Sequence, residues 1–196
     1  NGVDVEHFHS NNYKPGPLIR NDNRPLIGYH GAVASWFDAG LVAKVAELRP
    51  DYDFVIIGPV SDPKAEAELR SCSNIRLLGA MPYEDLPAYV AQFDASIMPF
   101  VLSKLTHAVR PLKILEYLSM GKPVVSTPIH EILDWPGVSF GETAESFAEK
   151  LDLALKNGLE DKETVEAFVM ESAWERVIQP LLKALDAKET QVKLKQ

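Results

Sequence analysis

The stretch ASIMPFVLSKLTHAVRPLKILEYLSMGKPVVST, residues 95–127, decides the fold class. It begins with the short apolar run 95–100, continues into a polar loop, and then shows the 3.6-residue periodicity of a helix over 111–120. A proline opens that helix and a glycine follows it. Proline is favoured at the start of a helix and glycine just past its end. The apolar run 123–127 comes next. This order predicts two parallel strands joined by a helical crossover.

The same alternation extends along the chain. Further apolar runs of strand length occupy 26–31, 53–58, 74–79 and, more weakly, 137–140. Helical periodicity appears over 37–49, 63–71, 84–93, 143–157, 160–170 and 172–187. The pattern predicts an α/β fold: a Rossmann-like, doubly wound parallel sheet of about six strands, with helices on both faces and a helical C-terminal region.

Three of these helices carry sequence signals for their first residue. Ser35–Asp38 and Ser172–Glu175 resemble capping boxes, in which the first side chain accepts a hydrogen bond from the helix backbone. Asp62 precedes Pro63, which predicts an N-cap followed by a first-turn proline.

Composition excludes several classes of protein. The 196 residues carry a net charge of -8, whereas a protein that binds nucleic acid needs a basic face. The single cysteine, Cys72, predicts no internal disulfide, and no apolar run reaches the roughly 18 residues of a membrane span. We therefore expect a cytoplasmic protein. It begins at Asn1 without a methionine, so we expect it to be part of a longer chain.

The known cofactor motifs are missing. The sequence contains neither G-x-G-x-x-G nor G-x-x-x-x-G-K-[ST], which disfavours a nicotinamide oxidoreductase and a P-loop nucleotidase. None of its histidines shows the spacing of metal ligands. We therefore expect no metal and no cofactor.

The start of the helix at 111 is the best candidate site. Ligands of an open parallel sheet bind beyond the carboxyl ends of the strands, and this helix follows the longest strand-end loop. Its free N–H groups can hold a phosphate, with Arg110 and Lys113 beside it. Glu116 lies about 4.5 Å further along the helix axis on the same face and could accept both hydroxyls of a ribose. The alternative is an ordinary surface pair between Lys113 and Glu116.

Two other loops are candidates at the same edge. The first strand ends at the stretch 28–38, GYHGAVASWFD, where Gly31 would let a ligand approach the backbone closely, although a plain tight turn is the alternative. Thr106 and His107 lie in the long loop before the helix and are candidates to face a sugar. A solvated loop histidine is the alternative for His107.

Six motifs in order resemble one known family. They are NGVDVEHF, IGYHGAVASWFD, FVIIGP, NIRLLGAMPYEDLPAYVAQFDASIMPF, PLKILEYLSMGKPVVST and SAWERV, and they span about 175 residues. Together they are similar to the C-terminal, donor-binding half of GT-B fold glycosyltransferases of the large retaining family that uses nucleotide sugars.

This resemblance implies roles for individual residues. Glu116 matches the glutamate that binds the nucleotide ribose, and the segment 111–113, including Leu112 and Lys113, matches the diphosphate cradle. Gly31 matches the glycine loop near the phosphates. Gly58 and Met81 match loops near the phosphate and the base.

The sequence also departs from the family pattern. A second glutamate that contacts the donor sugar is usual eight positions before the ribose-binding one, and Ala108 stands there instead. The basic pair that commonly follows the first strand is also missing. Lys113, with Arg110 or Lys104, could supply the displaced charge.

The resemblance predicts an interdomain junction over 1–24, a donor-binding domain over 25–187 and a polar tail over 188–196. The expected function is binding of a nucleotide-diphospho-sugar, with uridine as the base, for transfer to a hydroxyl acceptor in polysaccharide or glycoconjugate synthesis. The expected partners are the nucleotide sugar and an N-terminal acceptor-binding domain, with membrane association only through that domain or the acceptor. A non-catalytic nucleotide-binding module and a sugar-nucleotide 2-epimerase are the alternatives.

Overall fold

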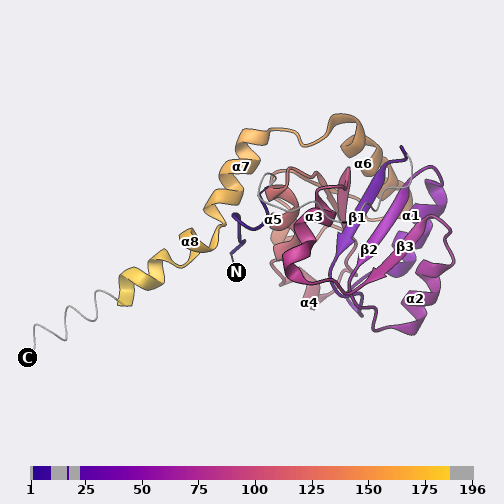
Figure 1. Cartoon of the computed structure of the whole chain (residues 1–196), viewed down its shortest axis with the longest axis horizontal. Coiled ribbons are helices and arrows are strands. Elements are labelled where there is room, and N and C mark those ends of the chain that lie inside the picture. Colours follow the sequence, from indigo (N-terminus) through magenta and orange to yellow (C-terminus); the bar gives the residue numbers. More distant parts are fainter. Residues whose placement is uncertain (1, 10–16, 18–22, 186–196) are drawn as a thin grey trace, which may run out of the picture.

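Six short strands form one parallel sheet in the order β3-β2-β1-β4-β5-β6 (Figure 1). They are β1 (Leu26–His30), β2 (Asp53–Ile57), β3 (Ile75–Gly79), β4 (Ala95–Met98), β5 (Val124–Ser126) and β6 (Val138–Phe140). The computed structural model describes residues 2–9, 17 and 23–185. The predicted doubly wound parallel sheet is confirmed, and each strand lies within its predicted run.

The apolar runs form strands because the sheet buries them. Every residue of β1, β2 and β4 is buried, as expected for central strands covered on both faces. The edge strands β3 and β6 are only partly buried. The strand β4 ends two residues before its predicted limit, at Met98, because Pro99 has no N–H to donate to the sheet.

Helices cover the sheet on both sides, as Figure 1 shows. The helix α1 packs against α2 and α6, and α5 packs against α7. The helices of the sheet region are α1 (Ala39–Leu48), α2 (Pro63–Arg70), α3 (Leu86–Val90), α4 (Lys104–His107), α5 (Leu112–Ser119) and α6 (Ala144–Asn157), with short 3-10 turns at Tyr83–Asp85 and His130–Ile132. The helix predicted over 84–93 is thus a 3-10 turn followed by the five residues of α3, and α4 was not predicted.

Two of the predicted caps are wrong and one is confirmed. Asp38, not Ser35, caps α1, and its carboxylate accepts a hydrogen bond of 2.8 Å from the amide of Leu41. Ser35 lies in a loop that bonds to neighbouring loops, so the helix begins only after it. Asp62 caps α2 as predicted and accepts a 2.9 Å bond from the amide of Lys64.

The C-terminal region extends away from the sheet (Figure 1). The helix α7 (Lys162–Glu171) ends at Ser172, and α8 (Trp174–Val177) is followed by helical residues 179–185. The predicted capping box at Ser172 is wrong, because Ser172 ends α7 and no side chain caps α8. The predicted helix over 172–187 is therefore interrupted, and the tail over 188–196 lies outside the described residues.

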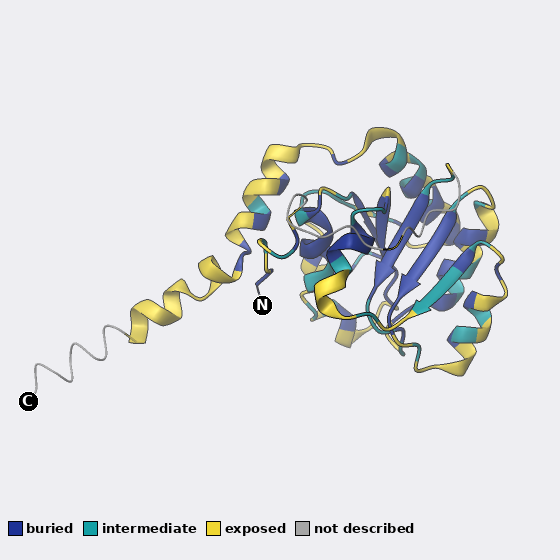
Figure 2. Cartoon of the chain, viewed as in Figure 1, coloured by how far each residue is buried: buried dark blue, intermediate teal, exposed yellow. Residues whose placement is uncertain are grey.

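One face of this C-terminal region is apolar and exposed. Its large apolar residues recur three and four positions apart, which is the spacing of one helix face. All are more than a third exposed, and Figure 2 shows these turns as exposed along their length. They are Trp174, Val177, Ile178, Leu181, Leu182 and Leu185.

The described N-terminal residues 2–9 pack against two parts of the fold. Val3 donates its amide to the carbonyl of Ser172 at 3.0 Å and forms a bridge with Ala173. Phe8 is completely buried in the core. The predicted junction over 1–24 is described only in part, so its limits stay a prediction.

Candidate functional site

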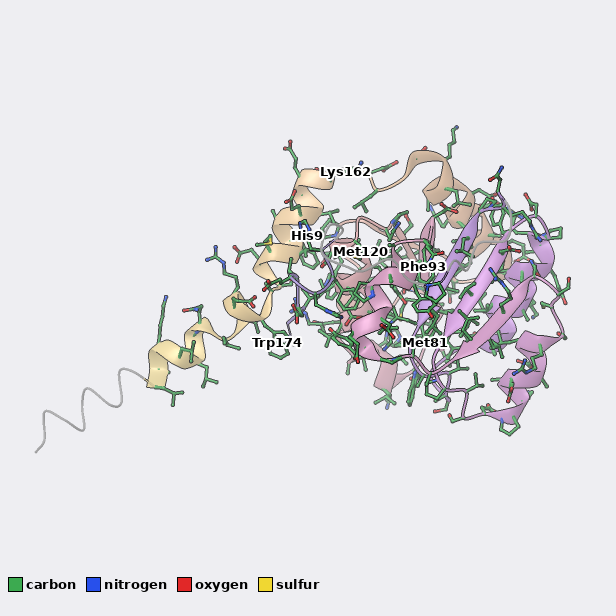
Figure 3. The ribbon with its side chains drawn as sticks, in the orientation of Figure 1. His9, Met81, Phe93, Met120, Lys162 and Trp174 are labelled. Carbon is green, nitrogen blue, oxygen red and sulfur yellow. The ribbon has the colours of Figure 1, made fainter. Side chains whose placement is uncertain are left out.

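The candidate site lies at the carboxyl ends of the strands, around the start of α5. The order β3-β2-β1-β4-β5-β6 changes direction between β1 and β4, and ligands of open α/β sheets bind at such a point. The loop after β1 is tied to its neighbours by bridges from Val33 to Val60 and from Phe37 to Phe100. Figure 3 shows Met81 beyond β3 at this same edge, where it is half-buried.

Two glycines continue the strands at this edge. Gly31 has φ +135°, and its amide donates a 2.7 Å bond to the carbonyl of Ile57. Gly58 has φ +145°, and a Cβ there would lie 2.1 Å from the carbonyl oxygen of Gly31. A Cβ on Gly31 would lie 2.0 Å from Cε of Lys113. Only glycine allows this packing, which brings the loop after β1 under the lysine side chain.

The N-terminus of α5 has no side-chain cap. Pro111 occupies the N-cap position and can offer no hydrogen-bond acceptor from its ring. In the described part of the chain, the amides of Leu112 and Lys113 have no hydrogen-bond acceptor. Free N–H groups and the helix dipole give this end a partial positive charge, which an anion would neutralise.

Lys113 adds a full positive charge beside these amides. Its side chain is half-buried, and burial lowers its pKa, while the charge of Glu116 acts in the opposite direction. No hydrogen bond or ion pair joins its ammonium to another described residue. The predicted alternative, an ordinary surface ion pair with Glu116, is therefore wrong. A partly desolvated cation at an uncapped helix start favours a bound anion.

Glu116 lies one turn further along α5 and is 8% exposed. Its Oε2 lies 3.2 Å from Nε2 of His30, although the ring N–H does not point at the oxygen, so no hydrogen bond is formed. The hydroxyl of Tyr83 donates to Oε1 at 3.5 Å. Burial, with the nearby charge of Glu116, raises the pKa of Tyr83 to about 12. Tyr83 therefore stays a hydrogen-bond donor at neutral pH.

The structure gives Arg110 other neighbours. Its guanidinium lies over the ring of Trp135, 5.2 Å from the ring centre, and donates to Oγ of Ser172 at 3.3 Å. These contacts join the loop before α5 to the end of α7. Neither contact involves Lys113 or Glu116.

The loop before α5 is more ordered than predicted, because it contains α4. Thr106 is 2% exposed, and its hydroxyl donates to the carbonyl of Val101 at 2.6 Å. With Ser103 it forms the capping box of α4. His107 is half-buried, and its Nδ1 accepts a 3.1 Å bond from the amide of His130. Thr106 therefore shapes the loop, while Nε2 of His107 is not used by that bond.

Three residues near Glu116 were not predicted: His30, Tyr83 and Phe8. His30 is 3% exposed and Phe8 is fully buried against it. They precede Glu116 by between 33 and 108 positions, so no local pattern joins them to it. The one available signal was a histidine ending an apolar run, just before Gly31.

A hollow of about 270 Å³ lies at the opposite end of α5. Figure 3 labels three of its lining residues, which are His9, Met120 at the end of α5 and Lys162 at the start of α7. It contains neither Lys113 nor Glu116.

Within the described residues, no three His, Cys, Asp or Glu side chains come together as a metal site. The helices of residues 2–9, 17 and 23–185 are also too short or too polar to cross a membrane.

The chain matches the family model of glycosyl transferases group 1 over residues 24–157. It is 32% identical over 130 residues to TuaH of Bacillus subtilis, whose name assigns it to teichuronic acid biosynthesis as a glycosyltransferase. This match covers 65% of the chain and 33% of TuaH.

Two solved structures whose complexes contain UDP show the same fold. HepE of Anabaena in complex with UDP matches with a TM-score of 0.64 and 12% identity, over 84% of this chain and 49% of HepE. A mutant of TarM from S. aureus, in a complex that contains UDP, matches with a TM-score of 0.63 and 14% identity, over 88% of this chain and 38% of TarM. The chain therefore spans between a third and a half of these proteins.

Proposed function

The chain belongs to the glycosyl transferases group 1 family, and from this premise we propose that it binds the nucleotide-diphospho-sugar donor of a glycosyl transfer. We propose a uridine nucleotide as the donor and a hydroxyl group of a growing polysaccharide or glycoconjugate as the acceptor. The UDP in the complexes of HepE and TarM supports the choice of nucleotide, and the likeness to TuaH supports the choice of pathway.

The start of α5 carries this proposal. Two free amides and the ammonium of Lys113 offer positive charge, and no described side chain forms an ion pair or hydrogen bond with that ammonium. Glu116 offers acceptor oxygens one turn away, about 4.5 Å along the axis at 1.5 Å per residue. We assign the diphosphate to Gly31, Leu112 and Lys113, and the ribose to Glu116.

The other predicted residues receive narrower roles. Gly58 and Met81 end or follow β2 and β3, and we assign the base to their loops. We assign the donor sugar to the side of His107, whose Nε2 is not used by the bond to His130. Arg110 is left out of the site, because Trp135 and Ser172 hold its guanidinium.

The proposed mechanism is electrostatic. Negative charge grows on the diphosphate as the glycosidic bond breaks, and donors fixed in advance stabilise that charge without reorganising. The amides of α5 belong to a packed helix, and Gly31 and the helix itself hold the Lys113 stem in place. Because these groups already supply positive charge, we propose that the diphosphate is bound without a metal ion.

We propose that the acceptor site belongs to another part of a longer protein. The relatives are two to three times as long as the segment that matches them. The exposed apolar face from Trp174 to Leu185 supports this, since contiguous apolar surface of this kind marks an interaction site. We infer that the acceptor part covers this face and that any membrane association comes through that part or the acceptor.

A non-catalytic nucleotide-binding module is the second candidate, because Ala108 stands where the family usually has a sugar-contacting glutamate. Ala108 is exposed at the end of α4, with no carboxylate of its own to offer. Glycosyl transfer by the longer protein would exclude this candidate, and UDP binding without any transfer would favour it.

Calorimetric titration of the chain with UDP and with inorganic pyrophosphate tests the proposed site. We expect Glu116→Gln to weaken UDP binding and to leave pyrophosphate binding unchanged, because only UDP has ribose hydroxyls. An equal loss for both ligands would remove the ribose assignment. Failure of the unchanged chain to bind UDP would remove the proposed function.

A further inference from the structure

Two side chains from distant segments lie beside the carboxylate of Glu116, one at each oxygen. His30 ends β1, and its Nε2 lies 3.2 Å from Oε2. Tyr83 follows β3 and donates its hydroxyl to Oε1 at 3.5 Å. The His30 separation is at the upper limit for a hydrogen bond but is poorly aligned, and the Tyr83 bond is longer than usual. Such contacts in ligand-free sites often shorten when the ligand is bound.

The carboxylate keeps unused acceptor positions in this arrangement. An ionised carboxylate has about four acceptor positions, two on each oxygen. His30 and Tyr83 use at most one on each, so one position per oxygen is left. That number matches the two vicinal hydroxyls of a ribose.

His30 has little choice of partner. Its ring is almost fully buried, and its Nε2 makes no well-formed hydrogen bond to any described residue. Its backbone is fixed, since its amide donates a 2.8 Å bond to the hydroxyl of Tyr117 on α5. A buried polar nitrogen without a partner is costly, and an oxygen of Glu116 lies 3.2 Å from it.

The N-terminal segment holds both rings from the other side. Phe8 stacks on His30 with ring centres 6.1 Å apart and 12° between the planes. His7 stacks on Tyr83 at 4.6 Å and 18°, and its Nε2 lies 3.0 Å from the carbonyl oxygen of Tyr83. Phe8 also meets the ring of Tyr83 edge-on at 5.6 Å. Neither ring can turn away from Glu116 without breaking these contacts.

We propose that His30 and Tyr83 are positioning residues for ribose recognition, which fix the Glu116 carboxylate so that its free acceptor positions meet the two ribose hydroxyls. This inference rests on the proposed function, because it assigns the ribose to Glu116. It adds that the affinity for ribose depends on two residues that act through the Glu116 carboxylate.

Tyr83→Phe tests the inference with little risk to folding. Tyr83 is 49% exposed, and phenylalanine keeps both ring contacts while it removes the hydroxyl. The probes are UDP and 2′,3′-dideoxy-UDP, which lacks the hydroxyls that Glu116 would bind. We expect the variant to weaken UDP binding about three- to tenfold, the range of one net hydrogen bond, and to leave dideoxy-UDP binding unchanged.

Tyr52→Phe is the matched control. Tyr52 also donates its hydroxyl to a carboxylate, Asp152 Oδ1, at 2.8 Å. It precedes β2, so it lies at the opposite end of the strands from Gly58. We expect this variant to bind UDP as the unchanged chain does. His30→Phe, with the fold checked by thermal unfolding, should show the same selective loss as Tyr83→Phe.

The double variant Tyr83→Phe/Glu116→Gln separates positioning from a merely structural role. If Tyr83 acts through Glu116, its substitution should have no further effect once the carboxylate is gone. Two results would overturn the inference and leave the proposed function intact. One is an equal loss of affinity for UDP and dideoxy-UDP in Tyr83→Phe. The other is no loss of affinity for either ligand in Tyr83→Phe, while Glu116→Gln still weakens UDP binding. No UDP binding by the unchanged chain would overturn both.

Discussion

Substitution of Lys113 by methionine separates the needs of binding from the needs of folding. Methionine keeps an unbranched, mainly apolar side chain over Gly31 and removes only the ammonium. That ammonium has no hydrogen bond or ion pair within the described structure, and its burial lowers its pKa. Because the free protein loses no partner and no longer buries a charge, we expect its free energy of unfolding to stay the same or to rise.

Binding should respond in the opposite direction. A hydrogen bond between charged groups contributes about 1.5–3 kcal/mol, and each 1.4 kcal/mol changes the dissociation constant about tenfold. Lys113 is already held beside the free amides of α5, so little ordering is needed when the diphosphate arrives. We therefore expect Lys113→Met to weaken UDP binding by a factor of roughly 10 to 150.

Isothermal titration with UDP at constant ionic strength measures this loss, and thermal unfolding without ligand measures stability. Lys44→Met is the matched control, because Lys44 is exposed on α1 and its substitution changes the net charge by the same amount. If both variants bound UDP equally well, the phosphate role of Lys113 would be wrong. A marked loss of stability in Lys113→Met alone would show that the lysine has a structural partner.

Three further outcomes follow from the same geometry. Gly31→Ala should lower the free energy of unfolding, measured with denaturant, by about 1–3 kcal/mol, because the new Cβ strains a backbone of φ +135°. The same Cβ displaces Lys113, so UDP binding should also weaken. Normal UDP binding by this variant would show that the ligand lies elsewhere. Gly28→Ala should lower the free energy of unfolding by a similar amount, because its Cβ would lie 2.1 Å from the ring of Phe93. The folded variant should keep its UDP affinity, which titration well below the unfolding temperature would show. Bound diphosphate raises the lowered pKa of Lys113, so UDP affinity above pH 8, where the phosphate is already fully ionised, should fall as the pH rises through the lowered value. The uracil N–H of UDP also ionises in alkaline solution, but equally for both proteins, so the fall should be steeper in the unchanged chain than in Lys113→Met; parallel pH profiles would contradict this.

The sheet could be predicted because burial acts on consecutive residues. Buried parallel strands are continuous apolar runs, and β1, β2, β4 and β5 were visible as such. The partly buried edge strands β3 and β6 were predicted as well, β6 from a weaker run. The helix starts were harder to predict. Ser35 has the spacing of a cap, but the loop around it pairs with the loops after β2 and β4, and Asp38 caps α1 instead. Tertiary hydrogen bonds of this kind leave no local pattern.

Only part of the candidate site could be predicted from local sequence patterns. Lys113 and Glu116 share one helix, so their spacing alone predicted a common face. The partners of Glu116 could not be predicted, because β1, the loop after β3 and the N-terminal segment bring His30, Tyr83 and Phe8 to it from far along the chain. Arg110 shows the converse: it is adjacent to the helix start in sequence, but Trp135 and Ser172 hold its guanidinium.

A crystal structure of the chain with bound UDP tests the central claim most directly. We predict the diphosphate on the amides of Leu112 and Lys113, with the lysine ammonium within hydrogen-bonding distance and the ribose hydroxyls on Glu116. UDP bound at another edge of the sheet, with the start of α5 still free, would contradict the account.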